Sequence, residues 1–518
     1  MHWNVPDKLT PQEKKLVARM RRKSRFYVFL REIRGQLFDE GFQAELAKAY
    51  APRGQDPLPP ALLAMVCLLQ AYTGVSDAEA VDEAEMDMRW QLVLGTLGQD
   101  KSPFGQGSLP RFRERLIEHN LDQRLLDRTV ELAKETGGFG WQKLKAALDS
   151  SPLSGCGRVE DSWNLIGHAM SRMVGVMAKV ADVPPEQIID DAGLTVLKGS
   201  SVKAELDISW DDAEQRSEAL NKVIDQANAL LAWAREHLST LIEQTEVREA
   251  AELLERILGQ DTEPDPDRPN RLRIKRGVAK DRICSAGDPD MRHGRKSSSK
   301  AFNGYKRYVA THVDVPLILA AEVHPANTPE YEAVPTLLAS VRHHGDLNEL
   351  VVDRGFVSHP EIEALDRKGT PVSCRPWPIQ NNTGRFTKLD FKIDLRSRRV
   401  TCPAGRTAMY SKKKLEAIFD AETCNACRKR DECTTAANGR SVQIHAQEGL
   451  HRRLRRRAAS KRGRHKLRER VAVEHRLARI GRTQTQRARY KGTRKNTLDL
   501  RRHAALANLV ELGSALAA

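Results

Sequence analysis

The sequence has few aromatic residues and no long apolar run. Phe, Trp and Tyr make up 5% of the 518 residues, which argues against binding single-stranded nucleic acid by base stacking, because stacking needs exposed rings. No apolar run reaches the roughly 18 residues of a membrane-spanning helix, and residues 1–4 do not begin a signal peptide. We therefore expect a cytoplasmic protein that makes no membrane contact.

Disulfides are not expected either. Eight cysteines in a chain of this length do not form a disulfide scaffold. Cys67, Cys156, Cys284 and Cys374 are scattered along the chain, a distribution that favours small buried thiols.

The other four cysteines are clustered. Cys424 and Cys427 form a C-x₂-C pair, Cys433 follows six residues later, and Cys402 lies 22 positions before Cys424. Four thiolates at such spacings are typical of a tetrahedral structural Zn²⁺ site. No βαβ pattern surrounds the pair, so a redox role is less favoured. The alternative to zinc is four free thiols in a small insertion.

Positive charge is abundant, and it is concentrated late in the chain. Residues 451–503 contain 21 Lys and Arg and 3 acidic residues, a net charge of +18, whereas the whole chain carries +16. Each phosphate that such a segment neutralises releases condensed counterions. The segment therefore predicts a polyanionic partner. Because rings for base stacking are few, double-stranded DNA is the expected one, and we expect the protein to be associated with the nucleoid.

Residues 12–136 have the pattern of a helical domain. Ser76 and Glu79 form a capping box. Ser108 is placed as the N-cap of a later helix that carries Arg111 and Arg113 and follows a short Gly-rich turn. This arrangement resembles a helix-turn-helix reader of DNA, but taken alone it fits an ordinary helical bundle with a charged face at least as well.

The following segments predict a mixed α/β sheet. A short apolar run from residue 144 ends at Asp149, and another from residue 349 ends at Asp353. Between them lie a hairpin at 308–323 and a helix at 328–342, and a short strand at 371–374 follows the second run. A long 3.6-residue apolar stripe predicts helices over 159–258, and the Pro- and Asp-rich residues 261–269 are expected to be a linker.

Three acidic residues combine with the basic stretch. Asp149 and Asp353 end strands that could be neighbours, and Glu474 lies on a later helix. Phosphodiester chemistry with two Mg²⁺ ions needs converging carboxylates. Singly, each Asp could be a turn or helix cap, and Glu474 could pair with Arg470 one turn earlier.

The chain resembles a bacterial insertion-sequence transposase of the DDE type. The following segments carry the resemblance: Ala147 to Leu153, Arg292 to Lys296, Gly304 to Lys306, Pro325 to Asn327, Val352 to Phe356, Thr401 to Gly405, Val473 to His475, and Arg501 with Arg502. Arg470 keeps the family spacing before the third acid, whereas Leu467 replaces a Tyr, Gly481 replaces a basic residue and Arg482 follows it. Asp161 is the competitor of Asp149 as the first acid.

The resemblance implies a ribonuclease-H-like core with Asp149, Asp353 and Glu474 as the catalytic triad, binding Mg²⁺ or Mn²⁺. It implies these units: an N-terminal DNA-binding domain (12–136), the first core strand region (140–158), a helical insertion and linker (159–270), the core (271–380), a Cys-rich insertion (381–450) and basic C-terminal helices with the third acid (451–518).

It also implies that the enzyme cleaves DNA at terminal inverted repeats and transfers the strand to target DNA, as a homodimer that joins two ends. A non-catalytic DNA-binding repressor and a metal-dependent nuclease without strand transfer are the alternatives. The expected DNA contacts are Arg111, Arg113, Arg292, Arg295, Lys296, Lys306, Arg307, Arg470, His475, Arg482, Arg487 and Arg489.

Overall fold

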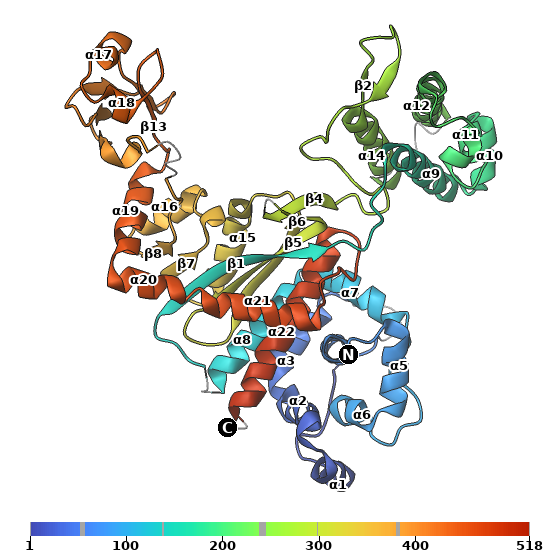
Figure 1. Cartoon of the computed structure of the whole chain (residues 1–518). Helices are drawn as coiled ribbons and strands as arrows, with labels where there is room; N and C mark the ends of the chain where they lie inside the picture. The colour runs from blue at the N-terminus through green and yellow to red at the C-terminus, as the bar shows by residue number, and fades with distance from the viewer. Residues whose placement is uncertain are drawn as a thin grey trace.

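The computed structural model describes residues 2–51, 57–136, 139–237, 245–297, 299–379 and 384–516. A mixed sheet with helices on both faces forms the centre, and the N-terminal helices pack against it (Figure 1). Two smaller bodies project away from this centre, one built from residues 162–274 and the other from the Cys-rich segment.

Six strands form the central sheet. They are β1 (Leu144–Ser154), β4 (Arg292–Ser297), β5 (Lys300–His312), β6 (Ile318–Pro325), β7 (Leu347–Val352) and β8 (Val372–Cys374). The order is β4-β5-β1-β7-β8, and β6 also pairs with β5. β5 is antiparallel to β1, β4 and β6, whereas β7 is parallel to both β1 and β8. The predicted mixed α/β sheet is therefore present.

The first strand is longer than the sequence predicts. β1 continues five residues beyond Asp149 to Ser154, because it keeps pairing with β5 up to the Ser154–Gly304 position. Its pairing with β7 stops earlier, at Leu148 opposite Val352. The expectation that Asp149 ends its strand was wrong, but Asp149 does lie where β1 extends beyond its parallel neighbour.

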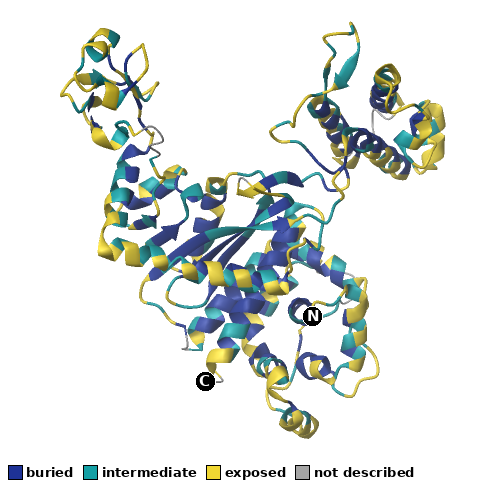
Figure 2. Ribbon diagram, viewed as in Figure 1, coloured by how far each residue is buried: buried dark blue, intermediate teal, exposed yellow. Residues whose placement is uncertain are grey.

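Alternate residues of the strands face two different cores, as a two-residue repeat requires. Figure 2 shows that the strands of the central sheet are largely buried. Ala147 of β1 and Val351 of β7 belong to the core shared with the N-terminal helices. Leu148 and Val352 belong to the opposite core. That second face is covered by α15 (Val334–His343) and α16 (Pro360–Arg367), which follow the short turns η3 (Glu330–Ala333) and η4 (Arg354–Phe356).

The N-terminal segment is helical, as predicted. Its elements are α1 (Pro11–Arg19), η1 (Arg22–Ser24), α2 (Arg25–Leu37), α3 (Glu40–Ala47), α4 (Pro60–Thr73), α5 (Asp77–Met86), α6 (Met88–Leu94), α7 (Ser108–Glu118) and α8 (Leu121–Glu135). The Ser76–Glu79 capping box is present. Ser108 is not an N-cap, because α7 begins at that residue and Gly107 precedes it without a side-chain cap.

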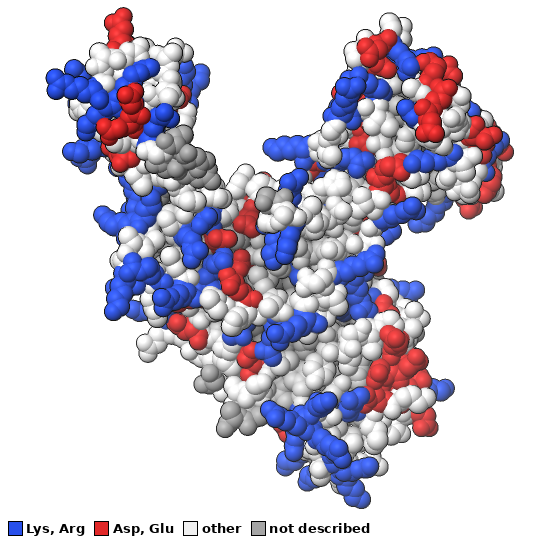
Figure 3. Space-filling model, in the orientation of Figure 1, with Lys and Arg blue, Asp and Glu red and all other residues white. Residues whose placement is uncertain are grey.

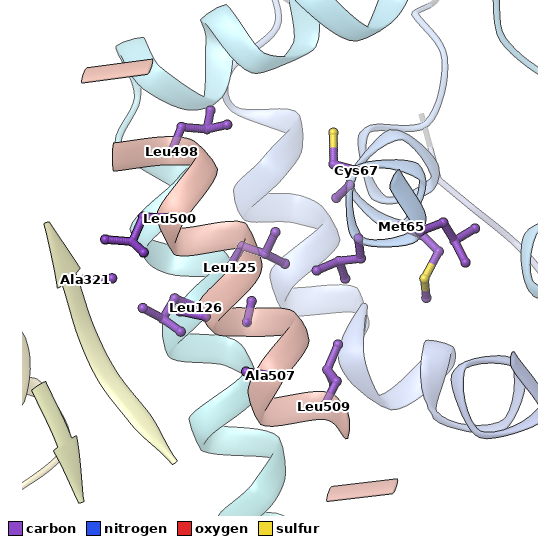
Figure 4. Packing of buried hydrophobic residues seen from close by; sticks show 14 of the residues in the cluster. Met65, Cys67, Leu125, Leu126, Ala321, Leu498, Leu500, Ala507 and Leu509 are labelled. Atoms are coloured by element: carbon purple, nitrogen blue, oxygen red, sulfur yellow. The ribbon is translucent and has the colours of Figure 1, made fainter. Parts of the chain in front are cut away.

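The last described helix, α22 (Thr493–Leu516), lies between the N-terminal helices and the sheet. It contacts α8, α4 and β6, and Figure 4 shows Leu500 and Leu509 of α22 packed among side chains of these elements. The N-terminal helices and the sheet therefore share one hydrophobic core through α22.

A buried ion cluster reinforces this junction. The Asp122 carboxylate on α8 is 2.6 Å from Arg494 and 3.0 Å from Arg501 of α22. Arg501 also pairs with Glu322 of β6 at 2.5 Å. Through Asp122 and Glu322, Arg501 thus connects three elements that are far apart in the sequence.

The helical insertion has a core of its own. Its elements are α9 (Ser162–Ala181), α10 (Pro185–Asp191), η2 (Thr195–Leu197), α11 (Val202–Leu206), α12 (Ala213–His237), α14 (Thr245–Asp261), β2 (Thr262–Pro264) and β3 (Leu272–Ile274). Asp161 caps α9 by accepting hydrogen bonds from the backbone N–H groups of Trp163 and Asn164. Part of the segment expected to be a linker instead forms the β2–β3 hairpin.

The Cys-rich insertion is a small body of short strands. Its elements are η5 (Lys388–Asp390), β9 (Lys392–Asp394), β10 (Arg399–Thr401), β11 (Thr407–Met409), β12 (Glu416–Ile418), α17 (Ala421–Asn425), α18 (Arg430–Cys433) and β13 (Ser441–Gln443). It has a separate core that includes Phe391, Val400 and Phe419.

The chain returns to the sheet through α19 (Glu448–Ala459), α20 (Lys461–Arg468) and α21 (Val471–Thr483). Within the described ranges, no single helix is long and apolar enough to cross a membrane. The bent pair of α4 and α5 meets those limits only when taken together.

Candidate active site

Strand register brings two of the predicted acids together. β1 and β7 run parallel, and Leu148 pairs with Val352. The next residues are Asp149 and Asp353, so both carboxylates leave the sheet at the same level of neighbouring strands. Asp149 is largely buried, whereas the Asp353 side chain is 44% exposed.

The third acid is carried by α21. Val473, Leu477 and Ile480 are the buried face of this helix, and the helix packs against β1 and β5. Glu474 therefore lies on the exposed side, next to the strand ends. The segment after α21 is tied to β1, because Ser154 N–H donates to the Gln486 carbonyl at 2.9 Å and Ala488 N–H donates to the Ser154 carbonyl at 2.7 Å.

A single guanidinium group contacts all three carboxylates. Arg470 Nη2 is 2.6 Å from Glu474, and Arg470 Nη1 is 3.2 Å from Asp353 and 3.7 Å from Asp149. The predicted Arg470–Glu474 pair is therefore present, and it is part of a larger cluster. Three acids that are far apart in the sequence therefore meet around one cation, beside the point where the pairing of β1 with β7 stops.

The cluster opens into a groove of about 540 Å³. The acids line one part of it. The cationic residues that line it are Arg295, Lys296, Lys306, Arg307 and Arg470. A groove that is lined by both carboxylates and cations can hold an anionic chain next to the three acids.

Burial and charge act together on Asp149. Desolvation raises the pKa of this carboxyl to about 6, and the negative charges of Asp353 and Glu474 push it in the same direction. The hydrogen bond from Ser150 N–H and the charge of Arg470 oppose this shift. The site therefore favours the binding of positive charge, because the carboxylates repel one another.

A fourth carboxylate, Glu330, lies in the same groove, and the sequence pattern did not single it out. Ser150 Oγ donates a hydrogen bond to Glu330 Oε1 at 2.5 Å. A Cβ atom at Gly355 would lie 1.8 Å from Glu330 Oε2, so glycine is needed there for the carboxylate to fit. Glu330 thus contacts the residue after Asp149 and lies against the turn that follows Asp353.

Several expected DNA contacts are used inside the protein. Arg113 and Arg292 are buried, and they pair with Asp77 and Asp281 at 2.5 and 2.8 Å. Arg307 is also buried, and it donates to Ser151 Oγ and to the Pro152 and Thr485 carbonyls. This arginine holds β1 against the segment after α21, a structural role that sequence alone did not indicate.

The other expected contacts remain at the surface or in the groove. Arg111, Arg295, Lys296, His475, Arg482 and Arg487 are exposed. Lys306 is half-buried and donates to the Thr328 carbonyl, and burial lowers the pKa of its ammonium group. Arg489 donates to the Val75 carbonyl at 2.9 Å.

The four clustered cysteines line one small cavity in the Cys-rich insertion. All four are free thiols, and burial raises the pKa of Cys433. Across the described residues, however, no three His, Cys, Asp or Glu side chains are close enough together to hold a metal ion as they stand.

Comparison with known families decides the identity. Residues 400–512 match the family described as "Transposase DDE domain", and residues 14–115 match one described as "Transposase domain". Both matches are to transposase families, and they support membership of the insertion-sequence DDE transposases. The transposase has no significant match among the curated proteins or the solved structures.

The first matched segment includes Glu474 and Arg470, and neither segment includes Asp149 or Asp353. Membership implies a DNA substrate and an enzyme of the nuclease or transposase kind, and the family generally uses a divalent metal such as Mg²⁺. The resemblance drawn from the sequence is thereby confirmed at the level of the family.

Proposed function

We propose that this transposase cleaves DNA at the terminal inverted repeats of its element and joins the freed ends to target DNA. The observation that supports this proposal most directly is the meeting of Asp149, Asp353 and Glu474 around one guanidinium group. The strand order, with three antiparallel strands followed by two parallel ones, favours a ribonuclease-H-like core.

The acids fit a divalent cation by their chemistry. Carboxylate oxygens are the ligands that Mg²⁺ and Mn²⁺ prefer, and the three acids already surround a positive group. Asp149, Asp353 and Glu474 would hold the ions, whose chemistry is to activate the attacking oxygen and stabilise the leaving one. Arg470 supplies the positive charge in the present conformation and would have to move aside.

The groove accounts for the position of the DNA. Lys296 and Arg295 on its wall would contact the phosphates, so that one phosphodiester bond lies over the acids. Water attacks the phosphorus in line, the bond to the departing 3′ oxygen breaks, and a 3′-hydroxyl is left. This hydroxyl then attacks a phosphodiester of target DNA in the same way, displacing a second 3′ oxygen. The joining of two ends favours a homodimer on DNA.

Catalysis is tested by Asp353→Asn, with Asp346→Asn as the matched control, since Asp346 is an exposed residue just before β7. The assay follows 3′-end cleavage and joined products from DNA with inverted repeats in Mg²⁺. Asp353→Asn should abolish both steps and leave DNA binding unchanged, because it removes a ligand charge but preserves shape. Normal cleavage by this variant would refute the site.

Wild-type behaviour separates the alternatives. Cleavage without joining would indicate a nuclease, and binding without cleavage would indicate a repressor.

We also propose that the Cys-rich insertion binds one structural Zn²⁺. Cys402, Cys424, Cys427 and Cys433 line a common cavity, and a small body with few core residues gains stability from a metal. Small side-chain movements would be needed to bring the four thiolates to one ion.

A further inference from the structure

A basic surface at the start of the chain is separate from the groove. It is formed by α1, η1 and the first residue of α2, and we call it the α1–α2 basic surface. All of its seven Lys and Arg residues are exposed: Lys14, Lys15, Arg19, Arg21, Arg22, Lys23 and Arg25. Figure 3 shows Lys and Arg gathered over the end of the molecule where α1 and α2 lie.

Within the described part of the chain, no acidic side chain pairs with these seven cations. The only acid between Pro11 and Arg25 is Glu13, which is buried and pairs with Arg31 at 2.8 Å. Among the residues that the structure describes, none of the seven basic side chains forms an ion pair. By contrast, Arg124 and Arg128 of the same helical segment each pair with more than one carboxylate.

The arrangement is unfavourable for the isolated protein. Lys15 and Arg19 are one turn apart on α1, and like charges at this spacing repel. Arg21 to Arg25 lie at the amino end of α2, where the helix dipole is already positive. A polyanion bound at this surface would offset both the repulsion between neighbouring cations and their repulsion by the helix dipole. A helix face that only contacts solvent does not need so many charges of the same sign.

The helix expected from sequence to read DNA is less suited. Phe112 and Leu116 of α7 are buried, and Arg113 is committed to Asp77. Arg111 is exposed, but so is the acidic Glu114, which lies three residues later on the same face of α7. Figure 1 shows α7 near the sheet and α1 at the far end of the helical segment, so the two candidate surfaces can be tested separately.

We propose that the α1–α2 basic surface binds the phosphate backbone of double-stranded DNA. This proposal rests on the proposed function and specifies how the N-terminal helices hold the element's DNA. Lys and Arg contacts to phosphates position a duplex without reading bases. The surface therefore supplies affinity and salt dependence, and any sequence preference comes from other contacts.

The test compares salt dependence of binding to a mixed-sequence DNA duplex. In the test variant all seven basic residues are changed to Gln. The slope of log K against log salt concentration should become shallower by up to about six, since each phosphate contact contributes about 0.9. An unchanged slope would overturn the proposal. Circular dichroism checks folding, which should be preserved because all seven side chains are exposed.

A charge-matched control isolates the position of the charge. It changes seven basic residues of the helical insertion to Gln: Lys179, Lys198, Lys203, Lys222, Arg235, Arg248 and Arg256. Residues 159–261 contain 20 acidic and 9 basic residues, so this segment should not face DNA. The control should bind DNA with a nearly wild-type slope of log K against log salt concentration. An equal decrease of this slope in both variants would refute the proposal that the α1–α2 basic surface is the one that binds DNA. Arg111→Gln tests α7 in the same assay.

Lysine acetylation gives an independent readout with the full wild-type chain. Lys14, Lys15 and Lys23 should be protected by the duplex, and equal labelling with and without DNA would contradict the proposal. Binding of these residues to phosphatidylserine vesicles but not to the duplex would also overturn it. A wild-type protein that binds no duplex refutes the proposed function as well, whereas binding without cleavage leaves the surface intact and refutes only the catalysis.

Discussion

Replacing Asp122 with Ala should strongly destabilise the junction of the N-terminal helices and the sheet. The Asp122 side chain is 3% exposed and pairs with Arg494 and Arg501. At 3.0 Å and an effective dielectric constant of about 20, one such pair has a gross attraction of about 5 kcal/mol, most of which offsets desolvation.

The loss on substitution exceeds the net contribution of the pair, because a buried charge is left behind. Removal of one partner of a buried pair costs about 3–5 kcal/mol. Arg501 keeps Glu322, and the Arg494 side chain is 35% exposed and reaches water. We therefore expect the low end of that range, about 3 kcal/mol, which corresponds to a fall in Tm of at most roughly 6 °C, because Tm shifts by about 2 °C or less per kcal/mol in units larger than about 250 residues.

Thermal denaturation followed by circular dichroism measures this loss, with Asp314→Ala as the control. Asp314 pairs with Lys145 at a similar distance of 2.8 Å, but its side chain is 51% exposed. An exposed pair contributes at most about 1 kcal/mol, so Tm should hardly change. Equal shifts in the two variants would refute the view that burial, and not pairing itself, makes Asp122 important.

Two further variants test the groove and the Cys-rich insertion. Glu330→Gln should slow cleavage by about tenfold without weakening duplex binding, because a hydrogen bond to a charged group contributes about 1.5 kcal/mol; a rate within twofold of wild type would rule out positioning of the Asp149 strand by Glu330. Cys427→Ser should abolish bound zinc in native mass spectrometry, whereas Cys156→Ser should retain it; wild-type protein that carries no zinc would show the insertion to be metal-free.

The sheet was predictable because its strands are apolar runs bounded by polar residues. The runs ending near Asp149 and Asp353 gave the approximate strand positions. Their alignment could not be read from one sequence, since it depends on the parallel pairing of β1 with β7. The continuation of β1 to Ser154 depends on β5, whose partner residues are about 150 positions away.

Charge was harder to interpret from sequence. The density of positive charge in residues 451–503 predicted a polyanionic partner, but many of these cations form ion pairs within the protein. Arg453 and Arg457, for example, both contact the buried carboxylate of Asp366. A count of charges cannot distinguish a cation that pairs with an acid far away in the sequence from a cation that is exposed to solvent. The shorter run from Lys14 to Arg25 contains fewer cations, although none of them forms an ion pair among the described residues.

The position of Glu330 in the site could not be predicted from the sequence for a similar reason. It lies in a short turn before α15 and has no strand or periodic pattern to mark it. Only the approach of Gly355 and Ser150 gives it a function in the site. A glycine directly after the Asp353–Arg354 pair was the one available signal, and by itself it indicated no particular partner.

The central position of α22 has a consequence for biosynthesis. This helix is translated after all the other described elements, yet α4, α8 and β6 all pack against it. Until it emerges from the ribosome, the apolar faces that it covers have no permanent partner, and such surfaces promote aggregation. A polypeptide truncated before Thr493 should therefore accumulate as insoluble material instead of a soluble DNA-binding fragment that competes with the intact enzyme.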